Sequence, residues 1–486
     1  MSQVEEHVSG ERSLELGGLL LAVVFTGSAL AFGGVRPTAY VLMEAGVVAA
    51  AVLCFWRGWP RIPRLAVLVL AVILGVPLLQ LVPLPAGLTA LVSPNRGLFA
   101  AQLLSPFSPP PAYLALSLNP HATQVAVFKL IAYALAFLIA QRLAVRGRGS
   151  ILLRTLVIVG LFEACYGLVQ YLTGWQYIFT YRKVFGTDDA TGTYINRNHF
   201  AGLLEMALPF VLAGALFRRP QRAELGVKRK LLAAISSESS PKLLSQAMVL
   251  AILSLALVFS RSRMGIAAAF AGLLLVGVLS YLRQRTRSVV WLLLLLLLIP
   301  ACYAFWIGTD AVISRFEILS HAGAMEQDRL PVWRDSLRLI RDFKWIGTGL
   351  GTYESVFGHY QTDVLYSYYE HAHSDYLEFA SELGIPAAVL LFGGLWVLAV
   401  GASRAAVRHS DRERRVLAAG SAGALAAILL HSITDFNLQI PANGLLFYWI
   451  AGTAAGVAFH ADSWGRDQNQ LRPIHGRTPA WPLGCF

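Results

Sequence analysis

Residues 264–281 read MGIAAAFAGLLLVGVLSY, a run without a single charged side chain. A helix needs about 20 predominantly apolar residues to cross the hydrocarbon core of a bilayer. The whole chain shares this character, because 56% of its 486 residues are hydrophobic and only 14% are charged, whereas a soluble domain carries about a quarter charged residues. The sequence therefore predicts an integral membrane protein.

Apolar windows of similar length recur along the chain. With the quoted run, twelve candidate spans lie near residues 16–34, 38–56, 65–83, 123–141, 155–173, 199–217, 244–260, 264–281, 288–306, 385–403, 413–431 and 441–459. We therefore expect an all-α integral membrane protein with about 12 transmembrane helices. Spans 1 to 9 would occupy residues 1–306, spans 10 to 12 residues 385–459, and a tail residues 460–486.

The basic residues predict how these spans are oriented. Lys and Arg concentrate in the cytoplasmic loops of membrane proteins, and 26 of the 40 Lys and Arg residues lie in the N-terminal segment, the tail and alternate loops. Both termini, and hence the tail, are therefore expected to be cytoplasmic. The net charge of +12 does not indicate a nucleic-acid partner, because it is spread between hydrophobic runs and forms no basic face on a soluble domain.

Three long segments lie on the opposite, outward side, at residues 84–122, 174–198 and 307–384. Loops of this length are uncommon unless they have a function. In the longest segment, which joins spans 9 and 10, the spacing of apolar residues predicts helices over 330–343 and 371–383. The loop is therefore expected to be partly helical.

The first of these loop helices is predicted to have two faces. An apolar face would hold Trp333, Leu337 and Ile340, and a basic face Arg334, Arg338 and Arg341. Arg334 and Arg338 are thus candidates for contact with an anionic or sugar substrate, and a solvated basic face is the alternative.

An arginine stands at the outward end of the sixth span, although positive charge is disfavoured on the translocated side. This residue is Arg197, and its neighbours Asn196, Asn198 and His199 are all polar. A guanidinium is a rigid fork of donors that suits phosphate oxygens. Arg197 is therefore a candidate phosphate ligand; the alternative is an interfacial arginine that reaches the lipid head groups.

Two more arginines, Arg261 and Arg263, lie in the short outward turn between the seventh and eighth spans. The segment reads Ser260-Arg-Ser-Arg-Met-Gly265. Two guanidinium groups in so tight an outward turn favour phosphate binding over a purely interfacial role, most of all for Arg263.

Residues 370–384 read EHAHSDYLEFASELG and hold two histidines. On a helix that begins at His371, this residue shares a face with Glu378 and Glu382, whereas His373 lies on another face. His373 would then point into the protein, and His371 toward solvent or an ion pair. An imidazole accepts protons readily at neutral pH, so His373 is a candidate general base; the alternative is a buried histidine without a chemical role.

The same segment has a spacing that occurs in metal sites, His371-x-His373-x-Asp375. A helix would send the two imidazoles to opposite faces, and Tyr376 stands where metallo-hydrolases carry another histidine. Cys54, Cys165, Cys302 and Cys485 show neither paired spacing nor a metal-type cluster. We therefore expect no metal and no disulfide framework.

The glycine-rich segment Gly347-Thr-Gly-Leu-Gly351 lacks the spacing and the βαβ surroundings of a dinucleotide site. Nucleotide binding is therefore excluded, and no cofactor is expected. The glycines are predicted to form a tight turn that approaches the membrane closely.

Several ionisable residues lie within or at the ends of spans. Glu44, Glu163 and Glu205 fall inside spans, where such groups are costly and often functional, but the sequence assigns them no role. His431 and Asp435 lie at the outward end of the eleventh span, where they complete the wall of a site or cap the helix.

Taken together, five segments resemble the bacterial O-antigen ligase/polymerase family, over roughly residues 190–460. These segments are 196–202, 262–265, 333–351, 373–384 and 431–437. Family members are multi-span glycosyltransferases of the bacterial inner membrane with a large periplasmic loop between late spans. Their donor is undecaprenyl-diphosphate-linked saccharide, and they use no nucleotide sugar. The resemblance implies a periplasmic active site and identifies residues 307–384 as the periplasmic loop.

The resemblance also assigns roles to single residues. Arg263 resembles the essential arginine that follows a span, Arg197 the arginine before an earlier span, and His373 the histidine of the loop. The implied reaction is metal-independent and inverting, with a glycan or lipid A core sugar as acceptor. The residues expected to bind substrate are Arg261, Asn196, Asn198, His199, Arg334, Arg338, Tyr376 and His431.

The sequence departs from the family pattern at two positions, and two other functions are alternatives to the ligase. Ser374 stands where the family often has Asn, and Glu378 where Gln is frequent, so contacts with the acceptor would differ. A polymerase that joins lipid-linked repeat units takes the same donor class, and the sequence does not separate it from a ligase. A flippase of lipid-linked saccharide would favour inverted repeats and broken helices, neither of which is evident.

Overall fold

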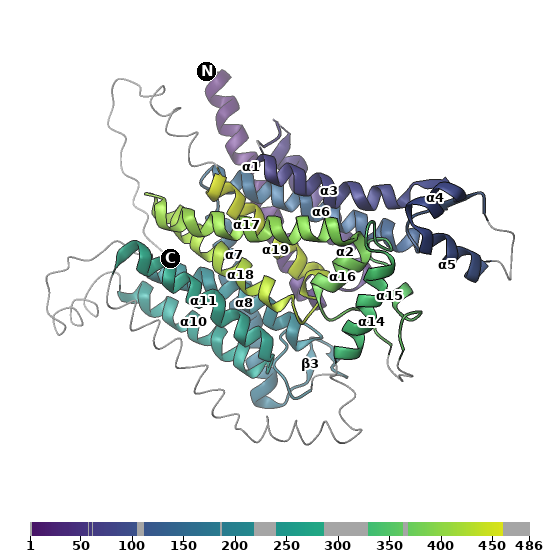
Figure 1. Ribbon diagram of the computed structural model, residues 1–486. Helices are drawn as coiled ribbons and strands as arrows, with labels where there is room; N and C mark the ends of the chain where they lie inside the picture. The colour runs from purple at the N-terminus through teal and green to yellow at the C-terminus, as the bar shows by residue number, and fades with distance from the viewer. Residues whose placement is uncertain are drawn as a thin grey trace.

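The structure is a computed structural model, and it describes residues 2–56, 58–60, 62–104, 111–184, 187–217, 240–285, 329–362 and 368–459. The predicted ninth span, the start of the long loop and the C-terminal tail lie outside the described residues. Long helices run side by side as one bundle (Figure 1). They are α1 (Ser2–Leu30), α2 (Pro37–Phe55), α3 (Arg64–Leu81), α6 (Pro120–Val145), α7 (Ser150–Thr173), α8 (Arg197–Leu216), α10 (Ser240–Phe259), α11 (Arg263–Gln284), α17 (Ile385–Arg408), α18 (Arg412–His431) and α19 (Pro441–Phe459).

Ten of these helices are long and apolar enough to cross a membrane, within the part of the chain that the structure describes. The prediction of an all-α multi-pass membrane protein is thereby confirmed. α18 coincides with the eleventh predicted span but is not among the ten. Its first turn is charged, and alanines and glycines dominate the rest. Neighbouring helices bury α18 almost completely, so it needs no lipid-facing side chains.

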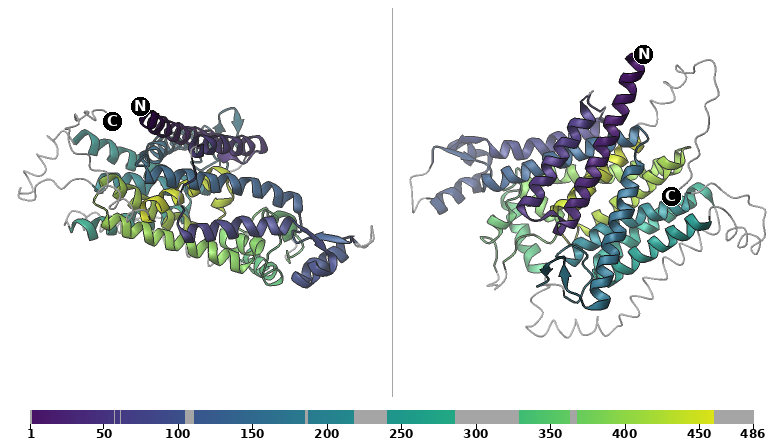
Figure 2. Two further views of the ribbon diagram at one scale, coloured as in Figure 1. Left: turned by 90° about the horizontal axis from the view of Figure 1, so that it is seen from above. Right: turned by 180° about the vertical axis from the view of Figure 1, so that it is seen from behind.

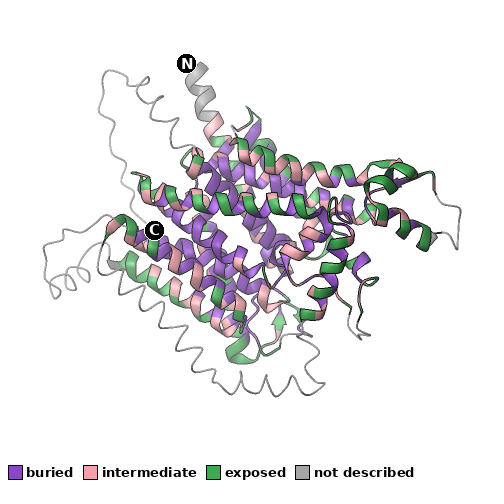
Figure 3. Cartoon of the chain, in the orientation of Figure 1, coloured by how far each residue is buried: buried purple, intermediate pink, exposed green. Residues whose placement is uncertain are grey.

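The core of the bundle consists of α8, α18 and α19, and Figure 3 shows buried residues concentrated there. α18 packs against α8, α11 and α17, and α19 against α6. The crossing of α11 and α18 depends on glycine: a Cβ at Gly272 would lie 2.6 Å from the carbonyl oxygen of Gly423, and a Cβ at Gly423 would lie 2.8 Å from that of Gly272. Small residues allow such close approach between membrane helices.

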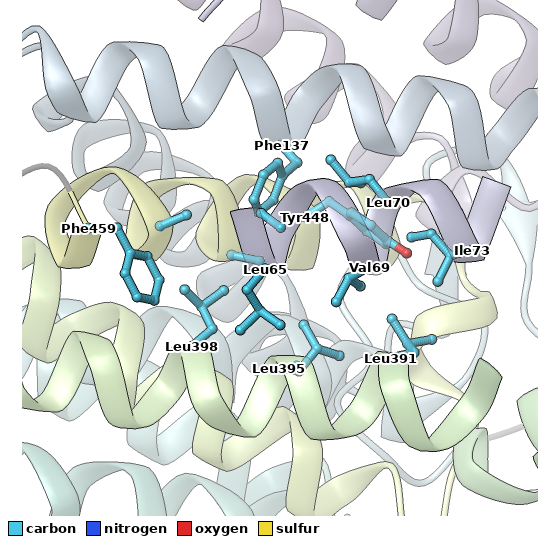
Figure 4. A pocket seen from close by; sticks show the side chains of 14 residues that line it. Leu65, Val69, Leu70, Ile73, Phe137, Leu391, Leu395, Leu398, Tyr448 and Phe459 are labelled. Atoms are coloured by element: carbon cyan, nitrogen blue, oxygen red, sulfur yellow. The ribbon is translucent and has the colours of Figure 1, made fainter. Parts of the chain in front are cut away.

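The outer helices expose apolar side chains, as expected for a surface in contact with lipid. In α3, for example, Val67 and Leu68 are about half exposed. A cavity of about 60 Å³ lies between α3 and α17, and Figure 4 shows the aliphatic and aromatic side chains that line it. Because the lining is apolar, water has few polar partners there. This cavity does not contain the polar residues of the predicted site.

Short elements gather at one end of the bundle, which Figures 1 and 2 show. They are the helices α4 (Ala86–Val92), α5 (Pro94–Leu104), α14 (Arg329–Asp342), α15 (Tyr353–Phe357) and α16 (Asp375–Leu383), the 3-10 turns η1 (Phe32–Gly34) and η2 (Asn437–Gln439), and two hairpins. Strand β1 (Pro83–Pro85) pairs antiparallel with β2 (Tyr113–Ala115), and β3 (Tyr177–Ile178) with β4 (Tyr181–Arg182). The loop that precedes α17 is thus partly helical, as predicted.

The predicted apolar face of α14 is wrong in part. Leu337 is 56% exposed, whereas Val332, Ser336 and Leu339 are buried together with Ile340. The buried face includes polar residues: the Ser336 hydroxyl bonds to Tyr353 and to the carbonyl of Val332. Apolar periodicity alone therefore does not predict the buried face of α14.

The glycine-rich segment after α14 forms the predicted tight turn, because Gly347, Gly349 and Gly351 all have positive φ. Its close neighbours include α16 and the start of α6, and its approach to the membrane stays a prediction. A Cβ at Gly347 would lie 2.1 Å from the carbonyl oxygen of Glu382. The turn thereby fixes α14 against α16.

Candidate functional site

Two arginines predicted to bind phosphate meet at one carboxylate. Asn196 caps α8 by accepting a hydrogen bond from the backbone N–H of Asn198, which places Arg197 in the first turn. Nη1 of Arg197 lies 2.9 Å from Oδ2 of Asp189, and Nη1 of Arg261 lies 3.8 Å from Oδ1 of the same residue. Asp189 is nearly buried, whereas both guanidinium groups are partly exposed. They are therefore open to an anion that enters from solvent.

Arg263 is the first residue of α11, and the Ser262 hydroxyl caps this helix by accepting from the N–H of Gly265. The Arg263 side chain is exposed. A Cβ at Gly265 would lie 3.3 Å from Cε1 of His431, so the start of α11 lies against the end of α18. The N-terminus of a helix favours an anion through its free N–H groups and its dipole. Arg263 thus stands where phosphate binding is favoured.

The turn that follows α18 joins three parts of the site through Asp435. Nδ2 of Asn198 donates to Oδ2 of Asp435 at 2.5 Å. Nη2 of Arg329, the first residue of α14, lies 3.3 Å from the same oxygen, and Arg329 also donates to the carbonyl of Thr434. Nε2 of His199 lies 3.7 Å from Oδ1. Asp435 therefore holds the starts of α8 and α14 together.

Asp435 is 1% exposed, and its carboxyl group lies 3.3 Å from the Arg329 guanidinium. Burial alone would raise the pKa of this carboxyl. His199, His431 and Arg329 more than offset burial and hold the pKa of Asp435 well below its usual range. The turn thus contributes a fixed negative charge that balances the positive charge of Arg329.

The next residue, Phe436, is surrounded by imidazoles. The ring of His371 stacks on it with centroids 4.1 Å apart, and those of His373 and His199 approach edge-on at 5.1 and 4.7 Å. The Phe436 ring therefore separates the three histidines and fixes where each of them lies.

His373 has the properties of a base. Its backbone has φ +49°, which is rare for a residue with a side chain, and such strain is often found at functional sites. Its Nδ1 is buried and makes no hydrogen bond within the described residues. Burial lowers the pKa of His373, and Arg329 and His371 lower it further against the opposing effect of Asp435. The imidazole is therefore neutral near pH 7 and can accept a proton.

His371 has the opposite character. Its Nδ1 lies 2.8 Å from Oε1 of Glu378, a buried carboxylate that also accepts from the N–H of Ala372. Burial lowers the pKa of His371, but the charge and hydrogen bond of Glu378 outweigh burial and raise it to about 9. The predicted ion pair of His371 is thus present, although its geometric premise was wrong: the helix begins at Asp375, after the cap Ser374, so both histidines precede it.

Other predicted residues make contacts elsewhere. Arg334 and Arg338 each lie 3.3 Å from Oδ1 of Asp335 on the same helix. The Tyr376 hydroxyl donates to the carbonyl of Leu429, and its ring stacks on Phe392. None of these contacts involves Asp435 or Asp189.

Two of the glutamates inside the spans, Glu205 and Glu163, have hydrogen-bond partners in the structure. His431 is buried, and its Nδ1 lies 2.9 Å from Oε2 of Glu205. Glu163 accepts hydrogen bonds from the N–H and the hydroxyl of Thr193 and so anchors the segment that leads to Arg197.

Within the described residues, no group of three or more His, Cys, Asp or Glu side chains is arranged to hold a metal ion.

Sequence reasoning missed Arg329, Phe436 and Asp189. Arg329 lies in the outward loop, so the rule that singled out Arg197 applies to it equally. Phe436 and Asp189 carry no such signal, because an aromatic and an acidic residue are common in any loop. Their roles depend on contacts between segments far apart in the sequence.

Comparison with known families identifies part of the chain. A family model described as O-antigen ligase matches residues 248–392. This segment is similar to the O-antigen ligase family. The match supports assignment of the chain to the O-antigen ligase/polymerase family and, with the helices above, an O-antigen ligase-like membrane glycosyltransferase or polymerase. No curated protein matches the chain.

The matched segment includes Arg261, Arg263, Arg329 and both loop histidines. Arg197 and the turn after α18 lie outside it. The structure nevertheless brings these outer segments against the matched segment, through Asp189 and through Asp435. The candidate site is therefore larger than the matched segment.

Proposed function

We propose that the protein moves a saccharide from an undecaprenyl-diphosphate carrier to an acceptor hydroxyl, in the manner of an O-antigen ligase. One observation carries the proposal: the neutral imidazole of His373 and the guanidinium of Arg329 belong to one cluster around Asp435 and Phe436. A base and a charge-stabilising group in one site suit the transfer of a sugar from a phosphate leaving group.

The proposed reaction is an inverting displacement at the anomeric carbon. The acceptor oxygen forms a bond to this carbon while the bond from the carbon to the phosphate oxygen breaks, and the acceptor proton passes to the His373 imidazole. The undecaprenyl diphosphate leaves with the electron pair of the broken bond. Arg197 and Arg263 hold its oxygens, and Arg329 lies beside the base. Guanidinium groups can supply the positive charge that a metal ion would provide, so the reaction is proposed to be metal-independent.

Asp189 is proposed to hold the arginine pair before substrate binds. Its carboxylate occupies the position between Arg197 and Arg261 that a phosphate group would suit. A diphosphate carries more charge than a carboxylate and offers more acceptor oxygens, so it can compete for the two forks. Asp189 thus keeps both side chains oriented in the absence of donor.

The proposed location is the bacterial inner membrane, with both termini cytoplasmic and the site periplasmic. The distribution of Lys and Arg supports this orientation. The contacts of Asp189, Asp435 and Gly265 agree with it, since they join the starts of α8, α11 and α14 and the end of α18, which the predicted topology places on one side. In this arrangement residues 307–384 are the periplasmic loop.

A polymerase that joins lipid-linked repeat units is the second candidate, because the family match covers both activities. Deletion of the gene followed by analysis of the accumulating lipid-linked saccharides tests the proposal. Long lipid-linked chains are expected for a ligase and single repeat units for a polymerase. Intermediates that accumulate on the cytoplasmic face would indicate a flippase and reject both transferase functions.

A further inference from the structure

An open cavity of about 400 Å³ lies beside the arginine pair, at the end of α7. It is lined by Tyr171, Gly174, Gln176, Thr187, Asp188 and Arg261. Figure 2 shows the nearby β3–β4 hairpin at the edge of the bundle in its right-hand view. Cavities of about 300–1,000 Å³ are typical of small-molecule sites, so this one is large enough for a ligand.

The lining of the cavity provides both donors and acceptors. An amide, a hydroxyl, a carboxylate and a guanidinium surround it, and Oε1 of Gln176 is buried without a hydrogen-bond partner in the described part of the chain. A buried acceptor without a partner is costly, and a ligand hydroxyl would satisfy it. The Tyr171 ring, which stacks on Phe259 at 4.4 Å, adds an apolar wall.

The charges at the cavity disfavour an anion. Asp188 is exposed in the lining, and the adjacent Asp189 lies between Arg197 and Arg261. A phosphate within the cavity would be repelled by the Asp188 carboxylate, whereas uncharged hydroxyl groups can accept from Arg261 and donate to Asp188. The chemistry therefore favours an uncharged compound rich in hydroxyl groups.

The position of the cavity connects it to the proposed reaction. Arg261 lines the cavity and lies 3.8 Å from Oδ1 of Asp189, whose other oxygen lies 2.9 Å from Arg197. A saccharide in the cavity would thus lie near Arg197, one of the two arginines assigned to the diphosphate. We propose that this cavity binds an uncharged saccharide segment of the donor or of the acceptor. The inference rests on the proposed function, which supplies the saccharide substrates.

Binding to the purified full-length protein in lipid nanodiscs tests the site directly. The probe is the free oligosaccharide released by mild acid from the lipid-linked glycan of the host. Gln176→Leu removes the amide at similar volume and should weaken binding about tenfold, the effect of one lost hydrogen bond of ordinary strength. Gln102→Leu on the exposed surface of α5 is the matched control and should bind as the unmodified protein does.

The proposal is overturned if the unmodified protein shows no saturable binding, or if Gln176→Leu binds as tightly as Gln102→Leu does. It is also overturned if Gln176→Leu changes only the retention of phosphatidylethanolamine in native mass spectrometry, because the site would then belong to a lipid head group. Binding does not depend on turnover. Saccharide binding by a protein that transfers nothing would therefore reject the proposed function and leave this site in place.

Transfer kinetics separate the two sources of saccharide. If the donor occupies the cavity, Gln176→Leu should raise KM about tenfold for lipid-linked donor and leave KM for acceptor and kcat unchanged. If the acceptor occupies it, KM should rise for acceptor alone. Weakened binding of the free saccharide with both KM values unchanged would mean that the cavity is not used in transfer, and would contradict its assignment to a substrate.

Discussion

Asn198 donates a 2.5 Å hydrogen bond to Asp435, and this bond joins the start of α8 to the turn after α18. The same carboxylate holds Arg329 at the start of α14. Phe436, the residue after Asp435, separates His371 from His373. Three segments that are distant in sequence therefore meet at one turn. The proposed base and the proposed charge-stabilising arginine depend on this turn for their relative positions.

Replacement of Asp435 by Asn should destabilise the protein and reduce transfer. Removal of one partner from a fully buried ion pair typically costs about 3–5 kcal/mol, and the loss here should be smaller because the Arg329 side chain is 32% exposed. A lower melting temperature in detergent, together with a reduced transfer rate, is the expected result. Glu354→Gln, at an exposed residue of α15, serves as control and should change neither. An Asp435→Asn variant with unchanged stability would show that this charge is not needed to balance Arg329.

The His371–Glu378 pair should make stability depend on pH. The pKa of His371 is raised to about 9 in the folded protein from about 6.5 in the unfolded chain. The folded state therefore gains from the bound proton, and the gain is fully present below about pH 6.5 and is lost as the pH rises through 9. Melting temperatures between pH 6 and 10 should fall across this window, and the fall should be smaller in His371→Gln. Equal pH dependence in both proteins would reject the pair as its source.

Arg263→Lys should not restore the activity lost in Arg263→Ala if the fork of the guanidinium is needed. Loss of one donor that stabilises the transition state typically lowers the rate about 10²–10³-fold, and Lys offers a point charge without the planar fork. Arg341→Lys, a change at a side chain that is 76% exposed, should be silent. Full activity of Arg263→Lys in a transfer assay would reduce the role of Arg263 to charge alone.

Gly423→Ala should destabilise the bundle by about 1–3 kcal/mol, the range found for overpacked cores. The added carbon would lie 2.8 Å from the carbonyl oxygen of Gly272, so α11 and α18 would have to separate. Gly393→Ala is the matched control, because nothing lies within 4 Å of a Cβ at that position. Thermal unfolding of both variants checks this, and equal melting temperatures would show that the two helices do not depend on close approach.

The transmembrane helices could be predicted from the sequence because hydropathy and length decide them. The candidate arginines could be singled out because positive charge is unusual on the outward side. The partners of these arginines could not be predicted from the sequence. Asp189 binds Arg197 only because the 174–198 segment folds back onto α8, and Asp435 meets Arg329 only through the packing of α14. The buried face of α14 was misplaced because Ser336 is polar yet buried.

The most direct test of the central claim is the transfer of saccharide from lipid-linked donor to acceptor by purified His373→Asn protein. Asn tolerates the positive φ of this position but does not act as a base, so the fold should persist, as an unchanged melting temperature would show. Loss of a general base typically costs 10²–10⁴-fold in rate, and a decrease of about that size is predicted. Transfer at the unmodified rate by the folded variant would contradict the assignment of His373 as the base.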